Sequence, residues 1–201
     1  MSLKELTMKQ HHNAERQKFA GILMSGKISE ELYLKYLQNQ FYCYYTLENH
    51  PDFNLPDDRL KRSDNILEDI QELRQKELNS LYNITDVQII DGEMYNMKNA
   101  LTKSTKDYIK YVKDNINTQE DFMAHVYVRY LGDLRGGQMI SKKVPGSGKY
   151  YEFDEPEELA KSIYRNINDD MADEAKKVFE YATKLFIEMY EGADTLKGWL
   201  P

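Results

Sequence analysis

Apolar residues recur every three or four positions through most of the chain, with polar residues between them. This spacing places apolar side chains along one face of a helix, whereas the two-residue alternation of half-buried strands is scarce. Prolines occupy only positions 51, 56, 145, 156 and 201. The pattern predicts an all-α fold, with helices over residues 3–24, 29–50, 60–81, 92–115, 118–143, 156–166 and 171–190.

Local signals mark several ends of these helices. Ser25 and Gly26 form a typical helix stop, and Ser29 precedes two glutamates that open the next helix. Thr118 precedes an acid-rich first turn and is a candidate N-cap. Residues 144–149 have the composition of a loop, and their Gly-Ser-Gly-Lys string lacks the spacing of a phosphate-binding loop.

The composition limits the classes of protein to consider. A length of 201 residues predicts one domain over 1–201. Lys+Arg 27 against Asp+Glu 34 gives a net charge of -7, which argues against an extended nucleic-acid surface. Cys43 is the only cysteine, which excludes an internal disulfide and a cysteine-based zinc or iron–sulfur site within one chain. We find neither a secretory signal nor a bilayer-spanning run, and expect a cytoplasmic protein without membrane contact.

The predicted helix 118–143 carries an unusual cluster of glycines. Gly132, Gly136 and Gly137 lie inside it, and each costs about 1 kcal/mol relative to alanine. Glycine lets a helix kink and lets its backbone approach a flat or bulky object. Asp133 lies among them. Its carboxylate either pairs with Arg129 one turn earlier, as on many solvated helix faces, or holds water against a bound group and passes protons to it.

His11 and His12 are the candidate metal ligands of the first helix. They point about 100° apart, so they cannot both face one ligand squarely. The pattern groups His12 with Met8 and other apolar residues and places His11 at a polar edge, which makes His12 the better candidate for the core. Two roles are open to each imidazole: a hydrogen bond to a neighbouring group, or a bond to iron. Periodicity alone does not decide which of the two histidines binds iron.

Three cations form a second candidate group. Lys161 and Arg165 are one helical turn apart, and Lys4 begins the first helix. Individually they read as surface charges. Together they suit a ligand with two carboxylates, such as a heme with its propionates.

Two distant segments resemble the heme oxygenase family. The stretch from Tyr130 to Gln138, Tyr-Leu-Gly-Asp-Leu-Arg-Gly-Gly-Gln, closely matches the distal-helix signature of that family. The stretch from Leu3 to Thr7, followed by His11, Glu15 and Phe19, matches the segment that carries the proximal histidine. The match selects His11 over His12. It implies a single-domain, multi-helix fold that holds heme between a proximal N-terminal helix and a kinked, glycine-rich distal helix.

The resemblance also implies a role for each candidate residue. His11 is the expected axial ligand to the iron of heme b, with Glu15 orienting its ring. Asp133 is expected to hold an ordered water, in a network completed by Tyr44, Tyr108 and Arg129. The residues expected to surround or anchor the heme are Lys4, Glu15, Tyr127, Gly132, Gly136, Gly137, Lys161, Arg165 and Phe179.

The implied reaction is oxidative cleavage of heme by O2 to biliverdin IXα, carbon monoxide and Fe2+. Electrons are expected from reduced ferredoxin or a similar acidic donor, and a bilin reductase is a possible downstream partner of what we expect to be a monomer. A candidate basic docking patch consists of Lys103, Lys106, Lys110, Lys113, Lys142, Lys143 and Lys149.

Two residues depart from the family pattern, and two alternatives stay open. Ala182 stands at the last-helix position that aligns with a polar member of the family's distal network, so we expect water to close that network. Arg135 stands where the family usually has serine, so its side chain must turn outward, meet a propionate or alter the pocket. The main alternative is a protein that stores, senses or transfers heme without degrading it, which has no need of Asp133. The second is a helical interaction module without heme, in which the glycines only permit close helix contact.

Overall fold

The structure is a computed structural model that describes residues 2–82 and 101–196, with side chains described for 2–76 and 101–193. Its α-helices are α1 (Leu3–Glu15), α2 (Lys18–Ser25), α3 (Glu30–Glu48), α4 (Ser63–Tyr82), α6 (Lys103–Asn115), α7 (Gln119–Ile140), α8 (Pro156–Tyr164) and α9 (Ala172–Leu196). Short 3-10 helices cover η1 (Asp58–Leu60), η2 (Lys149–Tyr151) and η3 (Asp169–Met171). Within these ranges no strand is found, and the all-α prediction is confirmed.

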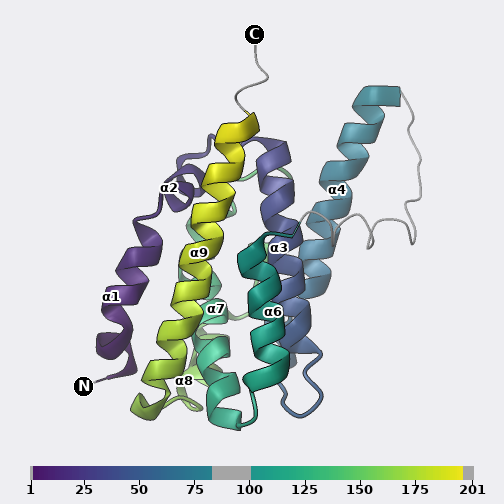
Figure 1. Ribbon diagram of the computed structural model, residues 1–201. Helices are drawn as coiled ribbons and strands as arrows, with labels where there is room; N and C mark the ends of the chain where they lie inside the picture. The colour runs from purple at the N-terminus through teal and green to yellow at the C-terminus, as the bar shows by residue number, and fades with distance from the viewer. Residues whose placement is uncertain (1, 83–100, 197–201) are drawn as a thin grey trace.

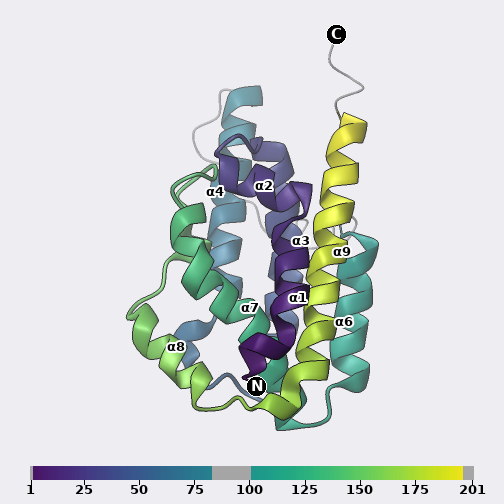
Figure 2. The same ribbon diagram turned by 90° about the vertical axis from the view of Figure 1, so that its left-hand side faces the viewer.

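The helices pack around α3 and α9. α9 contacts α1, α2, α6 and α7, and α3 contacts α4 and α6. Figures 1 and 2 show α1 and α6 on opposite sides of α9, with α8 beside the lower part of α7. The first turn of α1 and the chain that follows α8 lie at the same end of the molecule.

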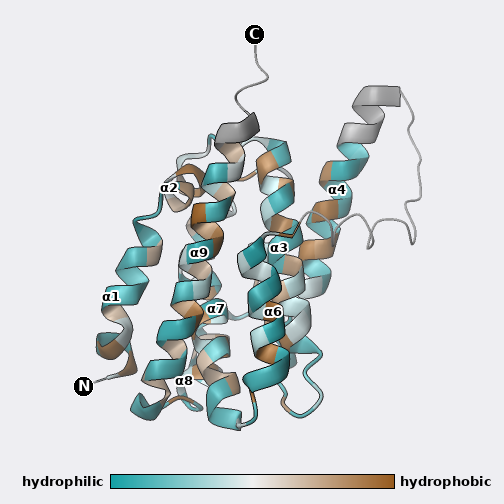
Figure 3. Ribbon diagram, viewed as in Figure 1, coloured by the Kyte–Doolittle hydropathy of each residue, from teal (hydrophilic) through white to brown (hydrophobic). Residues whose placement is uncertain are grey.

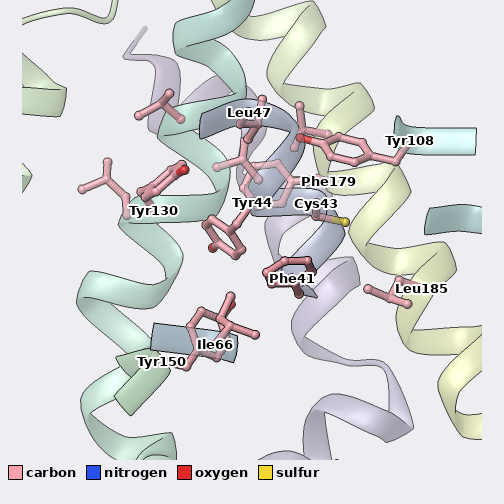
Figure 4. Close-up of a cluster of buried hydrophobic side chains, with 14 of the residues drawn as sticks. Phe41, Cys43, Tyr44, Leu47, Ile66, Tyr108, Tyr130, Tyr150, Phe179 and Leu185 are labelled. Atoms are coloured by element: carbon pink, nitrogen blue, oxygen red, sulfur yellow. The ribbon is translucent and has the colours of Figure 1, made fainter. Parts of the chain in front are cut away.

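α3 is buried on nearly every side, which explains its density of aromatic residues. Tyr33, Tyr44 and Leu47 are among its buried side chains, and each is at most 1% exposed. Figure 4 shows Tyr44 with Tyr130 of α7 on one side and Tyr150 of η2 on the other. By contrast, the face that α6 turns to the viewer in Figure 3 is mostly hydrophilic. A central, buried helix is therefore surrounded by amphipathic ones.

Several predicted boundaries are corrected by the structure. The predicted helix 3–24 is two helices, because Gln17 has an extended backbone (φ -64°, ψ 142°) between α1 and α2. Gly26 then ends α2 in the left-handed conformation that the stop signal predicts (φ 72°). The short helix η2 falls at the end of the predicted loop, and the first part of the predicted helix 92–115 lies outside the described residues. α7 begins after the predicted cap, where the Thr118 side chain accepts from the Asp121 backbone N–H.

No helix among the described residues is both long enough and apolar enough to cross a bilayer.

Candidate functional site

α1 presents His11 on an open face beside an aromatic ring and a carboxylate. The His11 side chain is 46% exposed, and its Nδ1 lies 3.4 Å from Oε2 of Glu15 one turn later. The ring of Phe179, on α9, meets the His11 ring edge-on with centroids 5.6 Å apart. Glu15 therefore stands beside one ring nitrogen of His11 and leaves Nε2 for a ligand.

His12 is exposed, so the expectation that it belongs to the core is wrong. Its Nε2 lies 3.1 Å from the sulfur of Met8. The two histidine rings are inclined at 62° with centroids 5.9 Å apart. Neighbouring positions on a helix point in different directions, so the structure separates the two imidazoles as the helical geometry requires.

The glycines of α7 are of two kinds. A Cβ built on Gly132 or Gly136 meets no atom within 4 Å outside the local helix backbone, so both face open space. A Cβ on Gly137 would lie 2.6 Å from Cδ1 of Tyr151. Gly137 is thus required by the packing of η2 against α7, which does not support its predicted place beside the heme.

Asp133 lies between the two open glycines and is anchored on its other side. The Tyr44 hydroxyl of α3 donates a hydrogen bond to Oδ2 of Asp133. Burial raises the pKa of Asp133 to about 6, although hydrogen bonds from Tyr44 and Tyr150 and the charges of Arg129 and Arg62 lower it. The carboxyl therefore titrates near neutral pH, as a group that exchanges protons must.

Arg129 is not the ion-pair partner of Asp133. Among the described residues no ion pair joins the two; the Arg129 guanidinium instead lies 4.0 Å from the centroid of the Tyr108 ring. Its Nη1 donates to Oε1 of Gln40 at 3.3 Å, and it is only 8% exposed. Its Nε is buried without a hydrogen-bond partner in the described part of the chain. The interpretation of Asp133 as half of a solvated surface pair is therefore excluded.

The network extends beyond the residues named from sequence. The Tyr108 hydroxyl lies 2.8 Å from Nδ1 of His125, and Nε2 of His125 lies 3.0 Å from Oε1 of Glu174. His125 stands in the glycine-bearing helix but has no role in the sequence-based site, and Glu174 is 49 residues away. The only sequence signal for His125 is its position in the helix that carries Arg129 and Asp133.

Arg135 turns outward. Its Nη1 donates to Oε1 of Glu157 on α8 at 2.8 Å, and half of its side chain is exposed. Of the three arrangements open to it, the structure has the one that leaves the space beside Gly132 and Gly136 free. The substitution for serine is accommodated by a surface ion pair.

The predicted cations lie at the edge of the site. Lys161 pairs with Glu158 on the exposed face of α8, and Arg165 caps the end of that helix. Lys4 is exposed in the first turn of α1, at the same end of the molecule (Figure 2). Tyr127 is half-buried on α7, and burial raises the pKa of its hydroxyl. Both lysines and Arg165 are exposed to solvent.

The lysines proposed as a docking patch divide into two groups. Four of them lie on α6, where Lys103 pairs with Asp107 and Lys110 with Asp114. Lys149, in η2, pairs with Glu68 of α4 and belongs to neither group. Lys142 and Lys143 lie at the end of α7, and Nζ of Lys143 donates to the carbonyl of Met24 at the end of α2. Figure 2 shows these two places on opposite sides of the molecule. The prediction of one continuous patch is therefore wrong.

A polar cavity of about 780 Å³ lies elsewhere, at the C-terminal end of α7. It is lined by Arg62, Gln138, Lys142 and Phe153 among others, and by none of the residues predicted to hold the heme. It is separate from the open space beside Gly132 and Gly136.

The residues present fit a heme by four observations. The exposed His11 supplies one imidazole from α1, and Gly132 and Gly136 leave the surface of α7 free for a flat group. Lys4, Lys161 and Arg165 are exposed cations of the kind that propionates need. A carboxylate held by a tyrosine lies between the open glycines. A porphyrin ligated from one side and covered by a bare helix surface on the other suits this set of donors.

A family model described as heme oxygenase matches residues 1–190. The chain belongs to the heme oxygenase family. The heme oxygenase of Guillardia theta is 30% identical over 183 residues, covering 85% of this chain and 73% of that protein. Heme oxygenase 2 of Macaca fascicularis is 27% identical over 96% of this chain, which spans 66% of that protein's length.

Solved heme oxygenases share the fold. Heme oxygenase-1 of Synechocystis in complex with heme has a TM-score of 0.71 at 22% identity and covers 98% of this chain and 94% of its own. The heme oxygenase of Leptospira interrogans has a TM-score of 0.68 at 25% identity, with 94% and 100% covered. The family resemblance and the all-α, heme oxygenase-like fold predicted from the sequence are thereby confirmed.

The titration of Asp133 predicts a pH-dependent stability. Its pKa is about 6 in the folded protein, against about 3.9 in an unfolded chain. Between these values the folded state keeps a proton that the unfolded chain has lost, so stability falls as pH rises. Comparing heme-free wild type with Asp133→Asn by urea denaturation, we expect the wild type to lose up to about 3 kcal/mol relative to the variant between pH 4 and pH 7. A difference independent of pH would show that Asp133 is not held in this environment.

The two kinds of glycine predict opposite effects of one methyl group. Gly136→Ala should stabilise the heme-free protein by about 1 kcal/mol, because alanine favours the helix and nothing obstructs it. Gly137→Ala should be less stable than Gly136→Ala by about 1–3 kcal/mol, because its Cβ collides with Tyr151. Urea denaturation of both variants measures the difference. Equal stability would contradict the close approach of η2 to α7.

Proposed function

We propose that this protein cleaves heme with O2 and reductant to biliverdin IXα, carbon monoxide and Fe2+. The observation that carries the proposal is the Asp133 carboxylate, which Tyr44 holds between two glycines that face open space. A protein that only binds heme needs an imidazole and propionate cations. It has no use for a buried, near-neutral carboxyl at the opposite face.

His11 is the proposed iron ligand. Its ring is accessible, and Glu15 beside Nδ1 fixes the ring and strengthens its ligand character. The bound heme supplies the iron that activates O2 and is itself the substrate. Phe179 packs against the His11 ring and keeps it from swinging away.

Asp133 is the proposed proton-managing group. A carboxyl with a pKa of about 6 exchanges protons readily at neutral pH, and the place of Asp133 between Gly132 and Gly136 would let it hold a water there. Gly132 and Gly136 keep bulk away from this water. Asp133 would therefore supply protons at the reacting face, and the two glycines would leave room for O2 beside it.

Orientation would determine which carbon is attacked. Lys4, Lys161 and Arg165 are proposed to hold the two propionates at the end of the molecule where α1 begins and α8 ends. With the propionates held there, α7 would cover part of the ring and leave one meso edge within reach of O2. The orientation of the heme, and not a difference in reactivity among its meso carbons, would then determine the product.

We further propose that a ferredoxin-like protein delivers the electrons and that the protein works in the cytoplasm as a monomer, with biliverdin passing to a bilin reductase. Lys142 at the end of α7 has no ion-pair partner in the described part of the chain, whereas Lys103 and Lys110 are neutralised by aspartates. The end of α7 is therefore the better docking candidate for an acidic donor.

Hemin binding and turnover test the proposal. Purified protein is mixed with hemin, then supplied with ferredoxin and its reductase, or with ascorbate, in air. We expect a sharpened Soret band on binding, followed by its loss as biliverdin absorbance appears. A reduced heme complex that persists in air would favour storage or transfer of heme, and no hemin binding at all would favour an interaction module.

A matched pair of variants tests the choice of ligand. His11→Ala should weaken hemin binding by at least about tenfold and stop biliverdin formation, because it removes the imidazole proposed to bind the iron. His12→Ala should leave both unchanged, because that ring points elsewhere. Loss of binding in His12→Ala alone would reverse the assignment.

A further inference from the structure

Glu174 of α9 is held by hydrogen bonds to several side chains. Its Oε2 accepts from the Lys177 ammonium at 2.8 Å and from the Tyr111 hydroxyl at 3.0 Å, while its Oε1 faces His125. Burial raises the pKa of Glu174, but these hydrogen bonds outweigh it and bring the pKa to about 2. The group is a carboxylate and can only accept hydrogen bonds.

The carboxylate fixes the tautomer of His125. His125 is fully buried, and burial lowers its pKa, so the ring is neutral and carries one N–H. That hydrogen must lie on Nε2, 3.0 Å from the Glu174 carboxylate, because a bare nitrogen would repel it. Nδ1 is therefore an unprotonated acceptor.

The tautomer in turn fixes the direction of the Tyr108 hydroxyl. Tyr108 lies 2.8 Å from Nδ1 of His125, so its O–H must donate to that nitrogen. Only the lone pairs of the Tyr108 oxygen then remain for other partners. Beside it Arg129 is a pure donor, buried over the Tyr108 ring with its Nε–H unpartnered among the described residues.

We propose that His125 and Glu174 are positioning residues that turn the Tyr108 hydroxyl hydrogen toward Nδ1 of His125, so that its oxygen is open to Arg129 and to water only as an acceptor. Tyr44 is oriented in the same sense, because its hydroxyl donates to Asp133. Water beside these groups can donate to either tyrosine and accept from Arg129, but receives no hydrogen bond from Tyr108. Asp133 is then left as the group that exchanges protons there. The effect on turnover rests on the proposed function, whereas the tautomer does not.

The tautomer is measured without heme. In ¹⁵N-labelled, heme-free protein, the His125 ring should show an unprotonated Nδ1 and a protonated Nε2 at neutral pH. Glu174→Leu should lose this pattern, because no acceptor then faces Nε2 of His125. A protonated Nδ1 in the wild type would overturn the proposal, because Tyr108 would then donate toward the site.

The coupling to Tyr108 is measured by a double-mutant comparison of biliverdin formation. His125→Leu should lower kcat about tenfold, or about 1.4 kcal/mol in the barrier. In a Tyr108→Phe background the same change should have less than about a twofold effect, since no hydroxyl remains to be oriented.

Tyr111→Phe is the control. The Tyr111 hydroxyl donates to Glu174 but does not lie between Glu174, His125 and Tyr108, so this variant should keep kcat within about twofold of the wild type. Equal losses from His125→Leu in both backgrounds would indicate a purely structural role and refute the proposal. Absence of turnover in the wild type would instead refute the proposed function, while the ¹⁵N measurement would still decide the orientation of Tyr108.

Discussion

The hydrogen bond from Tyr44 to Asp133 is the interaction on which the site depends. It joins the central helix α3 to the helix α7 next to Gly132 and Gly136, which have no side chains. A carboxylate in such a place is unfavourable unless it is hydrogen-bonded. Tyr44 provides that bond from a position that is itself 1% exposed, between Tyr130 and Tyr150 (Figure 4). The rigid aromatic core thus holds one polar group beside an open surface.

The rest of the fold keeps that surface open. η2 packs so closely on α7 that only glycine fits at position 137, while Gly132 and Gly136 stay uncovered. Arg135, the bulkiest residue of this stretch, is drawn away by Glu157 on α8. α1 and α7 both pack against α9, which places the accessible His11 on a separate helix from the glycines. The surface of α1 therefore carries an imidazole, and the surface of α7 carries exposed backbone and a carboxylate.

Much of this was predictable from the sequence, because helical periodicity and the distal signature are local in the chain. Neighbouring residues in the sequence were enough to predict most of the helices and the Thr118 cap. They also identified Asp133 as a candidate site residue. Contacts between distant segments were not accessible. The exposure of His12, the collision that requires Gly137 and the outward turn of Arg135 depend on which helices lie side by side. Periodicity assigns a residue to a face, but it does not say what covers that face.

The product formed by Asp133→Asn tests the central claim most directly. The variant keeps the shape of the side chain but cannot exchange a proton near neutral pH. Loaded with hemin and given ferredoxin, its reductase and O2, it should bind heme as the wild type does and form biliverdin at least about a hundredfold more slowly, as loss of acid–base catalysis predicts. Biliverdin formation at the wild-type rate would show that the carboxylate between the open glycines does not manage the proton.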